Sequence, residues 1–203
     1  MTRRTRGTAV RAALGCRVKS GWATAVLVEG PARSPSVVDR RVIELSDAHV
    51  PRSRQPYHAV RDAPQREAAK LERYLRRLVE RVTKRSLLAL LAEYRRQGRR
   101  VRRVALVVGS LIDPARIGND HIRAHALEGQ LFRTALERAA RAARLPCATL
   151  VERALYETAA RRLKRSPGAL RRTVTQLGGA RSGPWRADEK AATLAAWLAL
   201  RVS

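Results

Sequence analysis

The apolar residues of this chain form short runs, separated by longer stretches in which they recur every three or four positions. The most apolar run, residues 104–108 (VALVV), has the length and composition of a buried strand. Asn119 or Asp120 can cap a following helix that ends just before Pro146. A second apolar run at residues 147–151 completes a strand–helix–strand unit. Ligands in open α/β sheets bind beyond the carboxyl ends of such strands, so we expect a site near the loop that follows the first strand.

Three further strands and four further helices follow from the same patterns. Strands are expected between turn residues at 9–18, 22–29 and 36–45, and the charges of the third strand suit a sheet edge. Residues 46–63 are expected to be a solvated polar loop. Helices are expected at 64–98, with a kink or break at 83–86 where the apolar stripe shifts phase, and at 154–165, 167–177 and 185–201.

The first two turns of the helix after Asn119 carry polar groups on the face that points at the core. His121, His125 and Glu128 follow one another at spacings of four and three residues, which places two imidazoles and a carboxylate on one side of the helix. Buried polar groups must be paired. A metal ion bound by all three residues is one answer, and a hydrogen-bonded network with an arginine or with backbone carbonyls is the other.

Positive charge dominates the composition. The chain has 203 residues, with 43 Lys and Arg against 17 Asp and Glu, which gives a net charge of +26. Such a charge repels itself unless a polyanion or salt neutralises it, so nucleic acid, either DNA or RNA, is the expected partner. The length suits a single domain over residues 1–203, in which residues 1–8 are expected to be a disordered basic N-terminus.

The cysteines and the apolar segments exclude several classes of protein. Cys16 and Cys147 do not form a CxxC pair, which excludes a zinc ribbon and a disulfide scaffold. No apolar segment reaches the roughly 18 residues that a membrane helix needs, and the N-terminus has no signal-peptide core. The expected location is therefore the cytoplasm, without membrane contact.

Basic side chains gather without intervening acids in the last third of the chain. Between Glu157 and Asp188 there is no carboxylate, and clustered arginines can each grip a phosphate with two hydrogen bonds. With a lysine at the end of the first strand, these side chains are the predicted nucleic-acid contacts: Lys19, Arg161, Arg162, Lys164, Arg165, Arg171, Arg172 and Arg181.

Three segments carry a resemblance to a known family: GCRVKSGWATAVLV (residues 15–28), residues 157–177, and RADEKAATLAAWLAL (residues 186–200). They resemble the opening hairpin, the basic segment and the alanine-rich closing helix of the ribonuclease H-like superfamily, in its Holliday-junction resolvase (RuvC-like) branch. The order of strands and helices carries most of the resemblance. It implies an α/β fold in which a three-strand antiparallel unit and two parallel strands form one mixed five-stranded sheet flanked by helices.

The resemblance also implies where catalytic carboxylates would stand. Members of that family hold two magnesium ions with carboxylates from the first strand, the fourth strand and the closing helix. Here Arg17 stands at the first-strand position and Gly109 or a neighbour at the fourth-strand position. In the closing helix Asp188 matches one acidic position, whereas Ala191 replaces another. The resemblance therefore implies the fold and the basic surface without the family's hydrolysis.

Three functions are open at this point. The first is a nucleic-acid-binding ribonuclease H-like domain without two-metal nuclease activity. The second is a metal-dependent nuclease or resolvase, with Mg²⁺ or Mn²⁺ as cofactor and a site remodelled around Asp113, Glu128 and Asp188, with His121 and His125 as further ligands. The third is a basic assembly component of a nucleoprotein complex. A homodimer is also open, since the apolar stripe at residues 87–94 can serve a second copy or cover the sheet.

Overall fold

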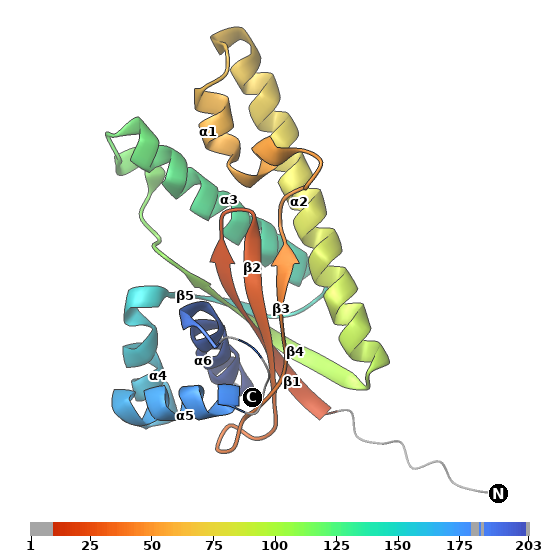
Figure 1. The fold of residues 1–203 in the computed structure, drawn as a ribbon, viewed down its shortest axis with the longest axis vertical. Helices are drawn as coiled ribbons and strands as arrows, with labels where there is room; N and C mark the ends of the chain where they lie inside the picture. The colour runs from red at the N-terminus through yellow and green to blue at the C-terminus, as the bar shows by residue number, and fades with distance from the viewer. Residues whose placement is uncertain (1–9, 180–182, 184, 202–203) are drawn as a thin grey trace, which may run out of the picture.

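Five strands form one mixed sheet in the computed structural model, which describes residues 10–179, 183 and 185–201 (Figure 1). The strands are β1 (Val10–Lys19), β2 (Trp22–Glu29), β3 (Ser36–Glu44), β4 (Arg99–Val108) and β5 (Cys147–Val151), in the order β3-β2-β1-β4-β5. The pairs β1–β2 and β2–β3 are antiparallel, and the pairs β1–β4 and β4–β5 are parallel. The predicted mixed sheet is confirmed. The predicted disordered N-terminus at residues 1–8 lies outside the described residues.

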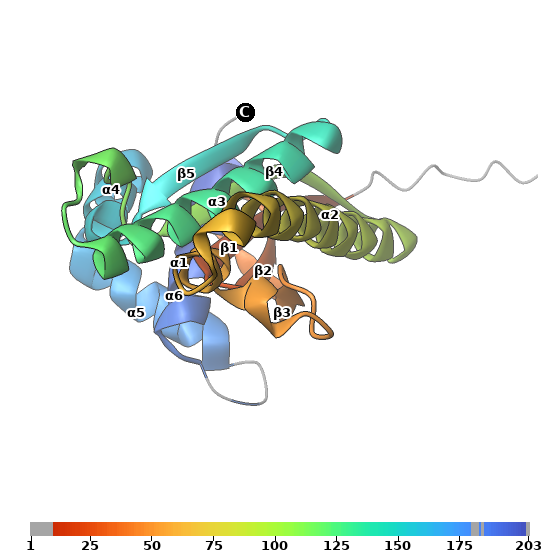
Figure 2. The same ribbon diagram turned by 90° about the horizontal axis from the view of Figure 1, so that it is seen from above.

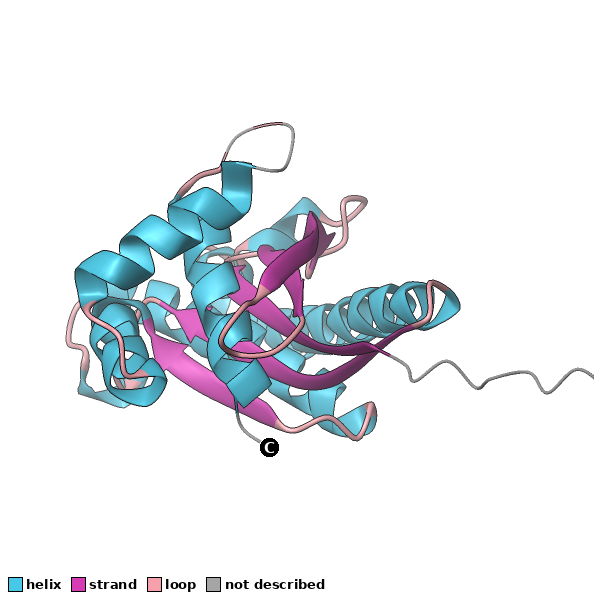
Figure 3. Ribbon diagram, turned by 90° about the horizontal axis from the view of Figure 1, so that it is seen from below, coloured by secondary structure: helices cyan, strands magenta, loops and turns pink. Residues whose placement is uncertain are grey.

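Helices cover both faces of this sheet. They are α1 (Pro56–Arg61), α2 (Gln65–Arg96), α3 (Asp120–Ala142), α4 (Leu155–Leu163), α5 (Pro167–Gly179) and α6 (Ala187–Arg201). α2 and α3 pack on the face that includes Leu14 and Leu106, and α4, α5 and α6 pack on the face that includes Ala13 and Val107. Figures 2 and 3 show the two groups of helices from opposite ends of the molecule. None of the helices in the described part of the chain has both the length and the apolar character that a membrane crossing requires.

The two-residue period of β1 decides which of its side chains reach which layer. Leu14 and Cys16 join the core beneath α2 and α3, whereas Ala13 joins the core beneath α6. Arg17 and Lys19 have the same parity as Ala13, and they stand at the carboxyl end of the strand. Strand parity therefore sends these two cations toward the α6 side of the sheet.

α2 is one continuous helix of 32 residues, so of the two alternatives predicted at 83–86, a kink or a break, the break is wrong. Thr83, which interrupts the apolar stripe, is fully buried, and its hydroxyl donates to the carbonyl oxygen of Leu45 at 3.4 Å. A buried polar side chain that finds a partner in the neighbouring layer can stay on the core face. The later part of the stripe, including Leu87 and Tyr94, covers the sheet. It is not a free surface for a second copy, and the homodimer stays a prediction.

Residues 46–63, predicted to be a solvated loop, contain two short helices. One is a 3-10 helix (Pro51–Arg54) and the other is α1, and each has proline in its first turn. α1 packs against both α2 and α3. The side chain of His58 is consequently held against α3, with 12% of it exposed.

α6 approaches β1 more closely than a strand side chain would allow. Gly15 faces α6, and a Cβ atom added to Gly15 would overlap the backbone of Ala192 and Ala196. The buried face of α6 is rich in alanine, which permits this approach. Glycine within a strand is typical of a place where another backbone comes close. The contact fixes the start of α6 beside the carboxyl end of β1.

The substitution Gly15→Ala is expected to lower the free energy of unfolding by about 3 kcal/mol or more, because overpacking costs about 1–3 kcal/mol even where side chains can move. The atoms in the way here are backbone atoms. Chemical denaturation measures the effect. Gly129→Ala is the matched control, since it adds the same methyl group where the space around α3 is open. The control should stabilise the protein by roughly 0.5–1 kcal/mol, and equal losses of stability from both substitutions would contradict the packing described.

Candidate functional site

Charged side chains from three elements meet at the carboxyl ends of β1 and β5. Arg17 is buried, with 6% of its side chain exposed, and its guanidinium donates to the two carboxylate oxygens of Glu152 at 2.5 and 3.2 Å. It also donates to the carbonyl oxygens of Val18 (2.8 Å) and Val107 (3.4 Å). Its Nε lies 3.7 Å from Oδ1 of Asp188, in the first turn of α6. A guanidinium does not lose its proton, so these oxygens supply the counter-charge that its burial requires.

Lys19 completes this group, with its Nζ 3.3 Å from Oδ1 of Asp188. We call the set Arg17, Lys19, Glu152 and Asp188 the Arg17 centre. Its two cations and two carboxylates balance one another. Of these, Glu152 was missed by the sequence analysis. It directly follows β5, and the rule that sites gather beyond the carboxyl ends of parallel strands applies to β5 as it does to β4.

The residues of the Arg17 centre do not fit a site for two magnesium ions. Mg²⁺ requires near-octahedral coordination by oxygen, and a two-metal site needs several free carboxylate oxygens. Here Arg17 and Lys19 lie within 4 Å of the carboxylates that would have to serve as ligands. Positive charge at this distance repels a divalent cation. The loop after β4 begins with Gly109 and Ser110, which supply no carboxylate.

A hollow of about 370 Å³ opens beside the Arg17 centre. Its walls come from the end of β1, the loop after β4 and one side of α3, and they include the cations Arg17, Lys19 and Arg133. Among the described residues that line it, none is acidic. The hollow is therefore suited to an anionic group such as a phosphate.

Exposed cations follow α4 and the first turns of α5, on the α6 side of the sheet (Figure 1). Lys164 ends α4 in the left-handed conformation, with φ of 53°, and the chain turns there into α5. In the described part of the chain, none of the predicted contacts in this region forms an ion pair with a carboxylate. We call this set the α4–α5 surface: Arg161, Arg162, Lys164, Arg165, Arg171 and Arg172.

Two guanidinium groups of the α4–α5 surface rest on aromatic rings. Arg165 lies over Trp197 at 5.2 Å from the ring centroid, and Arg171 lies over Tyr156 at 4.1 Å. Such contacts position a cation without neutralising its charge. Arg181, also predicted to bind nucleic acid, lies outside the described residues.

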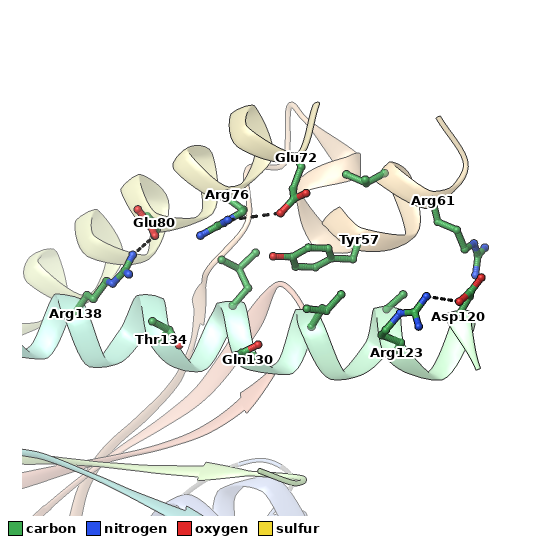
Figure 4. A pocket seen from close by; sticks show the side chains of 14 residues that line it. Tyr57, Arg61, Glu72, Arg76, Glu80, Asp120, Arg123, Gln130, Thr134 and Arg138 are labelled. Carbon is green, nitrogen blue, oxygen red and sulfur yellow. Dashed lines mark hydrogen bonds and ion pairs between the residues drawn. The ribbon is translucent and has the colours of Figure 1, made fainter. Parts of the chain in front are cut away.

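A larger hollow, of about 650 Å³, lies between α2 and α3, with Tyr57 of α1 pointing into it (Figure 4). Three of the four arginines in its walls are paired with carboxylates of the same walls, and the fourth, Arg61, pairs with the adjacent Asp62. The hollow therefore offers little net attraction to an anion. Its ion pairs are Arg138–Glu80, Arg76–Glu72 and Arg123–Asp120.

A second polar cluster joins α1 to α3. His121 and His125 contact each other through their Nε2 atoms (3.2 Å), and Nε2 of His58 lies 3.3 Å from Nδ1 of His121. Glu128 is fully buried behind the rings, and its Oε1 accepts a hydrogen bond from Nδ1 of His58 at 2.8 Å. We call His58, His121 and His125, with Glu128, the histidine cluster. Partial desolvation and the neighbouring His125, His58 and Arg61 lower the pKa of His121.

The three carboxylates of the predicted remodelled nuclease site are not brought together. Asp188 lies in the Arg17 centre and Glu128 in the histidine cluster, whereas Asp113 accepts a hydrogen bond from the backbone N–H of Ala115 at 3.0 Å. Within the described residues, one group of three or more His, Cys, Asp or Glu side chains has its ligand atoms close enough to share an ion, and it consists of the three histidines. The predicted convergence fails because α3 and α6 cover opposite faces of the sheet.

The order and pairing of these strands and helices are similar to the ribonuclease H-like fold of solved RuvC structures. Two solved structures of similar fold are "T. thermophilus RuvC in complex with Holliday junction substrate" and "Thermus thermophilus RuvC structure". The first has a TM-score of 0.53 and 13% identity over 95% of this chain and 94% of that chain. The second has the same score and identity over 94% and 93%. No family model matches the sequence, and a search of curated proteins finds no match. The likeness therefore establishes the fold.

The substitution Arg17→Asp is expected to create magnesium binding, because it removes the buried cation and adds a third carboxylate beside Glu152 and Asp188. Magnesium at ten times its Kd would stabilise the variant by about 1.4 kcal/mol, which is a rise in Tm of roughly 3–6 °C at this size. Thermal unfolding with and without Mg²⁺ measures it. Arg17→Gln, which removes the charge alone, should respond less. Equal stabilisation of the wild-type protein would contradict our account of the Arg17 centre.

Proposed function

We propose that this protein binds nucleic acid through the α4–α5 surface and the neighbouring hollow, without hydrolysing it by a two-metal mechanism. The observation that carries the proposal is a group of six exposed cations that have no carboxylate partner among the described residues. An unpaired basic surface on a chain of net charge +26 favours a polyanion. The match between DNA or RNA phosphates and arginine guanidinium groups supports nucleic acid as that polyanion.

The hollow beside the Arg17 centre supports the same proposal. It lies at the carboxyl ends of β1 and β4, which is where α/β sheets bind their ligands. Lys19 is partly exposed there, with 37% of its side chain accessible. A phosphate at the hollow would meet Lys19 and Arg133. The similar fold of T. thermophilus RuvC, which was solved in complex with a Holliday junction substrate, supports nucleic acid as the ligand.

Binding to duplex, junction and single-stranded DNA and to RNA is expected to weaken steeply with salt, since each neutralised phosphate releases counterions. The triple variant Arg161→Gln, Arg162→Gln, Arg172→Gln should bind less tightly. It should also lower the slope of log affinity against log salt by roughly 0.9 for each phosphate of B-DNA that the variant no longer neutralises. Fluorescence anisotropy over a salt series measures both quantities.

A matched control removes the same charge from the outer face of α2, where Arg77, Arg81 and Arg85 are exposed. The triple variant Arg77→Gln, Arg81→Gln, Arg85→Gln should keep its affinity within about a factor of two and its slope nearly unchanged. An equal drop in affinity in both triple variants would show that net charge, rather than the α4–α5 surface, governs binding. Affinity that does not depend on salt would contradict the proposal altogether.

The wild-type protein is expected to bind a four-way DNA junction without cleaving it in the presence of Mg²⁺ or Mn²⁺, because the carboxylates of the Arg17 centre are engaged by cations. Gel electrophoresis of the reaction products tests this. Cleavage by the wild-type protein that disappears in the double variant Asp188→Ala, Glu128→Ala would favour the remodelled nuclease instead.

A further inference from the structure

Three of the four histidines of the chain gather at one place that the proposed nucleic-acid contacts do not require. His121 and His125 lie one turn apart on α3, and α1 brings His58 against them. The ring centroids are 4.4–4.9 Å apart, and one nitrogen from each ring lies within 4.8 Å of the others. Two nitrogens bound tetrahedrally to zinc are roughly 3.3 Å apart. Nε2 of His125 lies 3.2 Å from Nε2 of His121, and Nε2 of His58 lies 3.3 Å from Nδ1 of His121. These contacts use different nitrogens of His121, so the exposed His121 ring would turn for one ion to bind all three rings.

The buried carboxylate of Glu128 lies close to two of the three histidine rings. Its Oε1 accepts from Nδ1 of His58, and its Oε2 lies 3.9 Å from Nδ1 of His125. This Oε2 is buried and has no hydrogen-bond partner. An unpaired buried carboxylate oxygen is costly unless positive charge lies close by. Both rings turn Nδ1 toward the carboxylate, which keeps their Nε2 atoms for an ion on the other side, as in carboxylate–histidine–metal arrangements.

The hydrogen-bonding groups of the cluster conflict when all three rings are neutral. His58 donates its Nδ1 proton to Glu128, so its Nε2 carries a lone pair. Arg61 can only donate, so Nδ1 of His121, which lies 3.1 Å from Nη1 of Arg61, also carries a lone pair. These two nitrogens face each other at 3.3 Å. A cation bound between the rings would remove this conflict.

We propose that His58, His121 and His125 bind one Zn²⁺ ion, with Glu128 as the positioning carboxylate behind them. Imidazole nitrogens suit zinc and other late divalent metals, whereas Mg²⁺ and Ca²⁺ prefer oxygen ligands. His121 and His125 are exposed, so their rings can turn to complete the coordination. Three protein ligands leave a fourth position for water or an anion. The ion would tie α1 to α3.

This site differs from the predicted metal site in one ligand. The sequence placed His121, His125 and Glu128 in the first coordination shell, whereas the structure gives the third position to His58 and moves Glu128 behind the rings. None of the three histidines belongs to the α4–α5 surface, whereas His125 also lines the hollow beside the Arg17 centre. Zinc binding is measured without nucleic acid, so its outcome is separate from that of the proposed function.

The test uses the full-length, untagged protein after treatment with a chelator. Calorimetric titration with zinc sulfate is expected to show saturable binding of one ion per chain, and metal analysis after gel filtration should recover about one zinc. Zinc should raise the Tm of the wild-type protein. Cobalt bound in its place should give the visible absorption of a four-coordinate ion.

The variants separate zinc binding from folding. His125→Gln changes a half-exposed ligand and should lower zinc affinity at least tenfold, and Glu128→Gln should lower it roughly 10–100-fold. His49→Gln is the matched control, since His49 is the remaining histidine and is exposed away from the cluster. It should bind zinc as the wild-type protein does. The absence of saturable zinc binding by the wild-type protein, or an equal drop in zinc affinity in His49→Gln and His125→Gln, would overturn the proposal and leave a hydrogen-bonded histidine network.

Discussion

The burial of the Arg17 guanidinium is the constraint on which the end of the sheet depends. Strand parity sends this side chain to the α6 face, where 6% of it is exposed, and its charge cannot be removed by deprotonation. Counter-charges must then come from the neighbouring elements, and they come from Glu152 after β5 and Asp188 in α6. Replacing a buried ion pair by apolar groups is often neutral for stability. The ion pairs of Arg17 instead specify how β1, β5 and α6 meet. They also engage the two carboxylates that would be needed as metal ligands.

The sequence predicted the sheet well because its signals are local. The apolar runs, the turn residues and the edge charges of β3 appear in the same order as in the structure, and Gly15 lies where α6 comes close. The failures occur where a tertiary contact overrides the local pattern. Thr83 breaks the apolar stripe of α2 but hydrogen-bonds to Leu45, so the helix continues. His58 looked solvated because its partner, Glu128, lies 70 residues away.

The arginines of the larger hollow and those of the α4–α5 surface differ in whether they have carboxylate partners. Between α2 and α3, the arginines that line the larger hollow are paired with carboxylates from the same helices (Figure 4). On α4 and α5, the cations have no such partners among the described residues, and two of them rest on aromatic rings. Acidic residues are scarce in this chain, so their placement decides which cations remain free for a partner. Exposed cations without such partners in the described part of the chain also follow the outer face of α2, where they include Arg77, Arg81 and Arg85. The α4–α5 surface differs from that face because no acidic residue stands between Glu157 and Asp188, so a polyanion would meet no carboxylate of this segment there.

The Arg17 centre disfavours a metal ion, whereas the histidine cluster favours one, and the two differ in which ligand atoms are free. His125 and Arg17 line the same hollow, so the two groups of residues lie on either side of one space. At Arg17, carboxylates that could hold a hard cation are neutralised by a guanidinium. At the histidines, the ligand nitrogens face one another and the one carboxylate stands behind them. On a chain of net charge +26, nearby basic groups repel a bound divalent cation. At the histidine cluster, imidazole nitrogens suit a late divalent metal and the buried Glu128 behind them offsets part of the added charge. At the Arg17 centre, the carboxylates are already engaged by Arg17 and Lys19.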